Sequence, residues 1–232
     1  MADLNFPTNP QIGDTWSIGN RTWIWNGYRW QIQTSIISLD PFTASRAIFT
    51  TSTVATTTST GALQVRGGVG IGGNILVGSG AISRGLTNVN AFSSGNFAAA
   101  GDAQSGLYIL RRTSNSITPS ELTTTGVAGD GLNQIVLPNN STYSFRILVT
   151  ARATTSQNEG GWEFYGVVNR NASASSIAIK VVNKTKIWSS VSGYDVNVGV
   201  NVTYGALQVL VNAADSNPVR FVARVETVEI TV

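Results

Sequence analysis

The feature that most constrains this chain is a low-complexity stretch, residues 50–78, in which Thr and Ser give way to single aliphatic residues set between glycines. Glycine has no side chain to bury and loses the most backbone entropy on ordering, so one copy of this stretch cannot build a core. A flexible linker is one interpretation, because Gly/Ser-rich segments often are linkers. However, the aliphatic residues keep the two-residue period of a β-strand, at Val65, Val69, Ile71, Ile75 and Val77. We therefore expect several copies to wind about one axis as an intertwined β shaft.

The overall composition favours β-structure and excludes several classes of function. Only 12% of the 232 residues are charged, about half of the usual quarter, and Thr, Ser, Asn and Gly supply the polar surface. The net charge is +3 and the basic residues are scattered, so we expect no nucleic-acid binding. Cysteine and histidine are absent, and no apolar run approaches the ~20 residues of a membrane span. We expect a soluble protein with no disulfide, no metal or other cofactor, and no membrane insertion.

Residues 1–35 are predicted to form a small Trp-rich β-hairpin module. The Asn26-Gly27 pair between alternating aromatic residues predicts a type I′ turn within a two- or three-stranded ribbon. A row of aromatic rings could stack on sugars, but a module this small needs large side chains merely to hold together. We therefore favour packing within the module or against a neighbouring protein, and the candidate residues for attachment to a virion are Trp16, Trp23, Trp25, Tyr28 and Trp30.

Residues 36–90 are predicted to be a connector followed by the Gly/Thr-rich shaft. They contain a GxGxxG pattern at Gly68, Gly70 and Gly73. A dinucleotide site would need a helix opening at the last glycine and an acidic residue some twenty positions later. A short strand-like segment follows instead, and no acidic residue occurs between Asp40 and Asp102. We therefore reject a cofactor site here.

The remaining residues are predicted to form a linker region with one short strand, residues 91–130, and an antiparallel β-sandwich of jelly-roll type, residues 131–232. The prediction rests on short stretches of strict apolar/polar alternation separated by turn residues. Near Glu226-Thr227 the apolar row changes parity. That change indicates either a β-bulge or a strand whose second face meets another subunit.

Two sets of residues resemble virion fibre proteins of tailed bacteriophages, especially cyanophages. The first set comprises residues 13–16, 22–27, 30, 58–63 and 67–73. The second set is similar to the C-terminal domain of many phage tail-fibre and structural proteins, and comprises residues 101–104, 110–112, 121–123, 137–141, 145–146 and 223–227. The resemblance implies a homotrimeric virion protein assembled in the host cytoplasm, with tail, baseplate or capsid proteins as partners. It implies that one end sits on the particle and that the C-terminal sandwich faces outward.

The carboxylates do not predict an enzyme. Hydrolysis of a glycosidic bond by two carboxyl groups needs them roughly 5 to 9.5 Å apart, whereas Glu159 and Glu163 would lie about 13 Å apart along one strand. Glu226 and Glu229 differ in parity and should face opposite ways. The absence of histidine and cysteine also removes the common nucleophilic triads.

The sequence thus predicts an all-β, non-enzymatic tail-fibre protein whose sandwich recognises the host surface, with a polysaccharide as the expected receptor. The candidate glycan-binding residues are Tyr165, Trp188 and Tyr194, with core packing as the alternative for each and the expected role for Trp162. A second hypothesis is a purely structural decoration or joining protein, such as a head fibre or baseplate component, that binds no receptor. A polysaccharide depolymerase ranks third.

Overall fold

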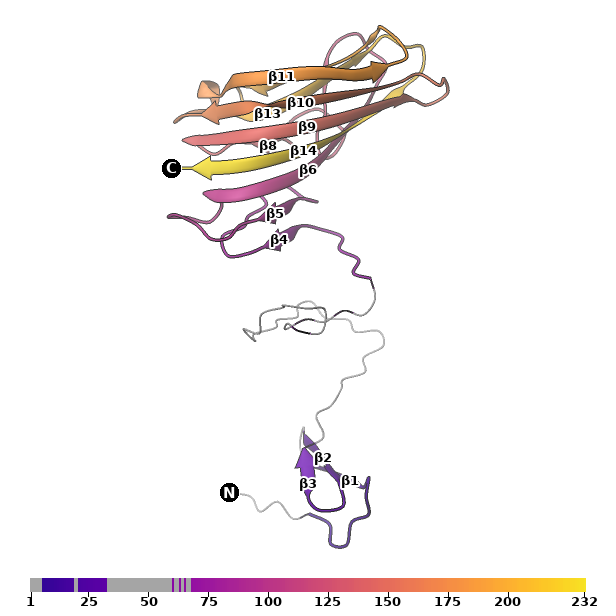
Figure 1. Cartoon of the computed structure of the whole chain (residues 1–232), viewed down its shortest axis with the longest axis vertical. Helices are drawn as coiled ribbons and strands as arrows, with labels where there is room; N and C mark the ends of the chain where they lie inside the picture. Colours follow the sequence, from indigo (N-terminus) through magenta and orange to yellow (C-terminus); the bar gives the residue numbers. More distant parts are fainter. Residues whose placement is uncertain (1–5, 19–20, 33–59, 61–62, 64, 66–67) are drawn as a thin grey trace. The chain divides into compact units, whose positions relative to one another are not determined.

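The computed structural model describes residues 6–18, 21–32, 60, 63, 65 and 68–232 (Figure 1). The chain divides into two compact units, Met1–Gly67 and Gly68–Val232. Nearly all of the predicted connector and the first half of the predicted shaft lie outside the described residues.

The N-terminal unit holds a three-stranded antiparallel sheet of β1 (Thr15–Ile18), β2 (Arg21–Trp25) and β3 (Trp30–Ile32). In this register Trp16 lies opposite Trp23, and Trp25 lies opposite Trp30. Residues directly opposite each other, and residues two apart on one strand, share a face of a sheet. All four indole rings therefore lie on one face. The parity of the sequence predicts this for Trp23 and Trp25, with Trp16 as a further candidate, and the register adds Trp30.

The hairpin between β2 and β3 is confirmed, but its predicted type I′ turn is wrong. Because Trp25 pairs with Trp30, the loop contains four residues, and only Gly27 among them has a positive φ, of 95°. A type I′ turn would need positive φ at both central residues. The loop is closed instead by the side chain of Asn26, whose Oδ1 accepts hydrogen bonds from the backbone N–H groups of Tyr28 (3.0 Å) and Arg29 (2.9 Å).

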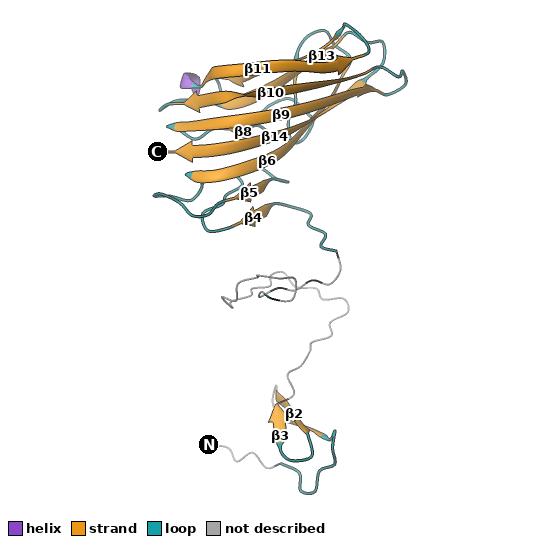
Figure 2. Ribbon diagram, viewed as in Figure 1, coloured by secondary structure: helices purple, strands orange, loops and turns teal. Residues whose placement is uncertain are grey.

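The C-terminal unit is a sandwich of two β-sheets, which confirms the predicted all-β fold (Figure 2). The larger sheet has seven strands in the order β11-β10-β9-β14-β6-β5-β4, and the smaller has the order β12-β13-β7, with β8 also pairing with β13. The one helical segment among the described residues is a short 3-10 turn, η1 (Ala174–Ser176). The strands are β4 (Ile75–Val77), β5 (Asn90–Phe92), β6 (Ala103–Ser114), β7 (Ser120–Glu121), β8 (Ile135–Val136), β9 (Ser141–Ala153), β10 (Glu159–Arg170), β11 (Ala178–Ser189), β12 (Tyr194–Asn201), β13 (Ala206–Ala213) and β14 (Val219–Thr231).

The sandwich begins earlier in the chain than the predicted boundary at residue 131. Strand β6 extends for twelve residues and pairs with β14, and β4 pairs in parallel with β5 at the edge of the same sheet. The side chain of Asn74 holds this edge, because its amide donates to the backbone oxygen of Leu86 and accepts from the backbone N–H of Val89, both at 2.9 Å. The predicted linker strand and the last residues of the predicted shaft therefore belong to the sandwich. Strands β9, β10 and β11 also run as a meander within one sheet, an arrangement simpler than the Greek keys of a jelly roll.

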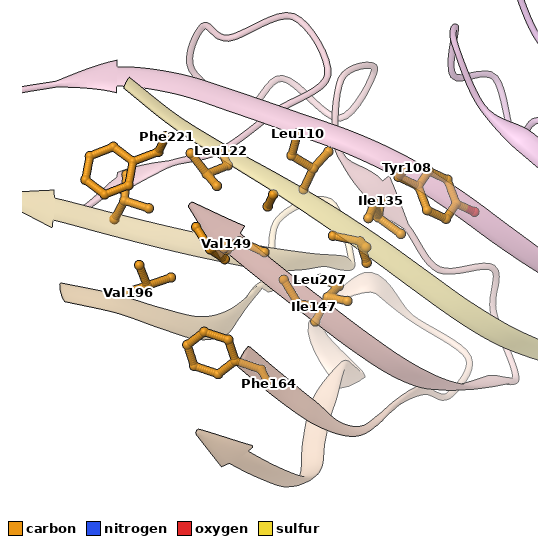
Figure 3. Packing of buried hydrophobic residues seen from close by; sticks show 14 of the residues in the cluster. Tyr108, Leu110, Leu122, Ile135, Ile147, Val149, Phe164, Val196, Leu207 and Phe221 are labelled. Carbon is orange, nitrogen blue, oxygen red and sulfur yellow. The ribbon is translucent and has the colours of Figure 1, made fainter. Parts of the chain in front are cut away.

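The core lies between the two sheets, where apolar side chains from alternate positions meet (Figure 3). The large sheet contributes Ile147, Val149 and Phe221, and the small sheet contributes Val196 and Leu207, all of them buried. Trp162 is also fully buried, as predicted. The core thus uses one face of the large sheet.

The parity change near the end of β14 is not a bulge. Strand β14 pairs with β6 and with β9 in an unbroken register over its whole length. The alternation therefore continues, so that Val228 and Ile230 point outward while Thr227 and Glu229 point into the sandwich. In the sequence the apolar row changed parity because the last inward positions hold polar residues and the last outward positions hold apolar ones.

Glu229 is the centre of a buried polar cluster that binds the loop between β4 and β5 to the sandwich. Its Oε2 accepts hydrogen bonds from Arg84 Nε (2.8 Å) and Gln104 Nε2 (2.9 Å), and its Oε1 accepts from the Tyr108 hydroxyl (2.7 Å) and from Thr227 (2.6 Å). Burial, and then the charge of Glu229, raises the pKa of Tyr108. Each carboxylate oxygen thus has two donors, as a buried charge requires.

We expect Glu229→Ala to lower the free energy of unfolding by about 3–5 kcal/mol, because it leaves the buried charge of Arg84 without a partner. The matched control is Glu226→Ala on the outward side of the same strand, where Glu226 pairs with Arg224 at the surface; loss of such a pair changes stability by about 0–1 kcal/mol. Urea unfolding of both variants at one protein concentration measures the difference. Equal destabilisation by the two substitutions would contradict this account of the cluster.

Candidate functional site

The second face of the seven-stranded sheet points away from the core, and we call it the outward face. It is formed by alternate residues of β6, β9, β10, β11 and β14, and it mixes arginines, glutamates and apolar side chains. Its members include Ser105, Leu107, Ile109, Arg111, Thr113, Ser144, Arg146, Leu148, Thr150, Arg152, Glu159, Gly161, Glu163, Tyr165, Val167, Val181, Asn183, Thr185, Trp188, Arg220, Val222, Arg224, Glu226, Val228 and Ile230.

Two of the three predicted glycan-binding residues lie on the outward face. The side chain of Tyr165, on β10, is 55% exposed, and that of Trp188, on β11, is 54% exposed. Trp188 lies opposite Gly161 in the register of β10, so the two aromatic rings belong to positions four residues apart, roughly 13 Å along the strand. Trp188 also borders a hollow of about 280 Å³ that Thr150, Arg152 and Glu159 line. Both rings are therefore available to a ligand that lies on the sheet.

Tyr194, the third candidate, is corrected by the structure. It is 0% exposed, its ring packs 6.3 Å from that of Phe221, and its hydroxyl donates to Asp215. The strict alternation of β12 explains this position, because Tyr194 shares the parity of the buried Val196. The alternation of apolar and polar residues along β12 could therefore have assigned Tyr194 to the core from the sequence alone.

Trp188 could not be placed from the sequence, because β11 is irregular. Its register with β10 shifts between Gly161 and Trp162 and again between Val167 and Val168. Each shift changes the face on which the following residues lie. Bulges and exposed lysines are common where an edge strand must avoid pairing with another chain, and β11 is an edge strand.

The ion pairs on the outward face leave two of its arginines without a partner. Arg146 pairs with Glu163 at 2.6 Å, Arg152 pairs with Glu159 at 2.8 Å, and Arg224 pairs with Glu226. In the described part of the chain, Arg111 and Arg220 have no ion pair. Exposed pairs of this kind contribute little to stability.

The residues predicted for virion attachment divide into a packed group and one exposed residue. Phe6, which was not among the candidates, lies 4.8 Å from Trp16, 5.6 Å from Trp23 and 5.4 Å from Trp30 between ring centroids, and Trp25 lies 5.7 Å from Trp30. These rings hold the small sheet together. Tyr28, by contrast, is 92% exposed at the tip of the loop between β2 and β3, so it is the residue of this group most available to a partner.

The acidic residues of β7 and of the neighbouring loops have structural partners. Asp102 accepts hydrogen bonds from the backbone N–H groups of residues 97–99, of which those of Ala98 and Ala99 most strongly lower its pKa. Glu121 accepts from Gln134, and Asp130 accepts from the backbone of Leu132. Within the described ranges no group of three acidic residues is placed to hold a metal ion, and no helix is long and apolar enough to cross a membrane.

Asp215 closes the turn between β13 and β14 beside the buried Tyr194. Hydrogen bonds from Asn158 (3.0 Å), from the Tyr194 hydroxyl and from the backbone N–H of Asn217 (2.9 Å) lower the pKa of Asp215 to about 2. Burial, and then this hydrogen bond to Asp215, raises the pKa of Tyr194. The carboxylate thus holds the turn in its ionised form.

The contribution of Asp215 to stability should therefore depend on pH. Because its folded-state pKa is lowered, its contribution is fully present above about pH 4, near the pKa of an ordinary aspartate, and is lost as the pH falls through the folded-state pKa of about 2. We expect Asp215→Asn to lower the melting temperature at pH 6, and we expect the difference from the unsubstituted protein to shrink between pH 4 and pH 2. Thermal unfolding across this range measures both; a difference that stays constant with pH would contradict the role of the ionised carboxylate.

Comparison with known proteins identifies no family. No family model matches the chain, and no curated protein matches it. Among solved structures, a tailspike protein from Acinetobacter baumannii bacteriophage Fri1, a capsular polysaccharide depolymerase, is similar over 54% of this chain and 18% of that chain, with a TM-score of 0.32 and 13% identity. The chain therefore spans less than a fifth of the length of that tailspike, and a match at this TM-score and identity assigns neither a family nor an activity.

Proposed function

We propose that this chain is a non-enzymatic phage fibre protein, a homotrimer whose N-terminal unit binds the virion and whose sandwich binds a polysaccharide on the host surface. The observation that carries this proposal is the outward face of the seven-stranded sheet. It exposes Tyr165 and Trp188 beside arginines and open hollows. The opposite face of the same sheet packs against the smaller sheet to form the core. An aromatic ring offers a sugar a large apolar surface at a low entropic cost. A broad face of this kind suits an extended, repetitive ligand.

The trimer is supported by aliphatic side chains that are exposed in the described part of the chain. Among the described residues of the predicted shaft, Leu63, Val65, Val69 and Ile71 are all exposed. A run of exposed apolar residues in a soluble protein commonly marks an interaction site. Identical segments around a shared axis would bury these residues together and would place three sandwiches on one fibre. Three weak sites on one fibre then bind a repetitive surface with avidity.

The proposal excludes catalysis because the acidic residues of the sandwich are engaged elsewhere. Glu159 and Glu163 each bind an arginine of β9, and Glu229 is sealed inside the sandwich. Hydrolysis of a glycosidic bond would need two carboxyl groups facing the same bond. Loss of binding, without loss of any bond-breaking activity, is therefore the expected consequence of changes on the outward face.

A second candidate function is a structural joining or decoration protein of the virion, and one observation favours it. At one end of the outward face, Val228 is 68% exposed and Ile230 is also exposed, beside a hollow of about 380 Å³ lined by Ser105, Ser144 and Arg146 among others. Apolar side chains in such a position suit contact with another protein. In that case the sandwich would bind a virion component and no glycan.

The oligomeric state is tested by light scattering on the full chain. We expect a mass three times that of the 24.5 kDa chain. The double variant Val69→Asp/Ile71→Asp should lower this mass, because charges cannot be buried between the copies without a partner. Leu132→Asp, which changes an exposed apolar residue elsewhere, is the matched control and should leave the mass unchanged. A monodisperse monomer of the unsubstituted chain would contradict the fibre proposal.

Receptor binding is tested on an array of host-envelope polysaccharides with the full chain. We expect Tyr165→Ala and Trp188→Ala each to weaken binding several-fold, since a stacking contact contributes of the order of 1 kcal/mol. Phe97→Ala, which removes an exposed ring from a loop, should have no effect. An absence of binding to every polysaccharide would favour the joining protein, and release of reducing ends would contradict a non-enzymatic role.

A further inference from the structure

A hollow at one end of the outward face is lined by three arginines. It has a volume of about 420 Å³, and it is bordered by Arg111, Arg112 and Thr113 of β6, by Arg220 of β14, and by Thr125 and Gly126 of the loop that follows β7. This volume lies within the range of roughly 300–1,000 Å³ that is typical of ligand sites. The other hollows on the outward face that we describe contain paired arginines, so this one differs in its charge.

The loop wall of the hollow is held in place by hydrogen bonds. Thr123 bonds to β6 through the backbone, with Arg111 N–H donating to the Thr123 oxygen at 2.9 Å. The Thr123 hydroxyl accepts from the Gly126 N–H at 3.0 Å and donates to the Val127 oxygen at 2.8 Å. Thr125 Oγ1 accepts from Asn133 Nδ2 at 3.0 Å, which leaves its own proton free to donate to a ligand. The hollow is therefore preformed.

The three arginines have no anionic partner in the part of the chain that the structure describes. None of them forms an ion pair. Nη1 of Arg112 is also buried without a hydrogen bond, but Arg112 has the parity of the inward residues of β6, so the outward donors are those of Arg111 and Arg220. Arg220 also lies directly opposite Arg152 in the register of β9, and like charges in that arrangement repel each other. Two nearby acidic residues, Glu121 of β7 and Asp130 of the loop that follows it, bind Gln134 and the loop backbone. An anion in the hollow would pair with Arg111 and Arg220 and reduce the repulsion.

The register of the sheet connects this hollow with the exposed tryptophan. Trp188, Gly161, Thr150, Val222 and Arg111 form one row across β11, β10, β9, β14 and β6. Four strand spacings separate the ends of the row, about 19 Å. The residues between these ends are small or uncharged. One extended chain could therefore contact the Trp188 ring and the arginines at the same time.

Resting on the function proposed above, we infer that the ligand of the outward face is an acidic polysaccharide. It lies along this row, with its anionic groups bound by Arg111 and Arg220 and a sugar ring stacked on Trp188. Guanidinium groups bind planar carboxylates, and also sulfate or phosphate, through paired charge-assisted hydrogen bonds. A neutral polysaccharide would leave these donors unused. The charge of the ligand thus becomes the main source of selectivity.

The test measures binding of the full chain to polygalacturonic acid, dextran sulfate and uncharged dextran by calorimetry. We expect binding to at least one of the two acidic polymers, stronger than to dextran and weakened by salt. Arg111→Gln/Arg220→Gln should weaken this binding by about tenfold or more, because it removes charge-assisted hydrogen bonds. The matched control, Arg146→Gln/Arg224→Gln, removes the same charge from the same face but from arginines that already have partners, and should change the affinity less than the first pair does.

The outcomes separate this inference from the function on which it rests. Equal losses in the two double variants, or equal binding to dextran and to the acidic polymers, would overturn the arginine site while leaving a polysaccharide-binding fibre intact. An altered mass of Arg111→Gln/Arg220→Gln in light scattering would also overturn it, by showing that the arginines contact another copy of the chain. Absence of binding to these three polymers and to host-envelope polysaccharides would instead overturn the proposed receptor function.

Discussion

The unbroken pairing of β14 with both β6 and β9 is the constraint on which the rest of the sandwich depends. Because the side chains of a strand alternate between two faces, one register for three long strands determines which residues enter the core and which face solvent. It brings Phe221 and Val225 into contact with the core residues of the smaller sheet, and it places Arg220 and Arg224 on the outward face. A shift of one residue would exchange these two sets.

Charged residues are few in this protein, and most of its carboxylates have a partner. With only 12% of residues charged, most of the carboxylates have an assigned cation or set of N–H donors. Glu229 binds Arg84 inside the sandwich, whereas the glutamates of β10 neutralise arginines of β9 on the surface. Arg111 and Arg220 stand apart from this pattern, since their positive charge is not balanced within the described chain. An unpaired positive charge on a face whose other charges are paired creates a local positive potential, which attracts anions.

The sequence predicted the strands of the sandwich well because alternation is a local signal. It also predicted the burial of Trp162 and the shared face of the tryptophans. It failed where a side chain depends on partners distant in the sequence. The polar positions Thr227 and Glu229 concealed the continuity of β14, because Arg84, the partner of Glu229, lies 145 residues away. The register shifts between β10 and β11 determine the face on which Trp188 lies. The apolar/polar pattern of the sequence does not show where these shifts occur. Phe6 was missed as the centre of the tryptophan group because a single aromatic residue outside a strand has no period.

The position of β14 in the sheet has a consequence for how the protein is made. This strand follows all the others in the sequence, yet it lies between β6 and β9 in the middle of the sheet. During synthesis, the edges of β6 and β9 that face β14 stay unpaired until β14 has been synthesised. Contacts between residues so far apart in the sequence also form slowly. Exposed strand edges invite pairing with other chains, so this is the interval in which a nascent chain is most at risk of aggregation. The delay also means that the arginine hollow, shared by β6 and β14, exists only on a sandwich that has finished folding.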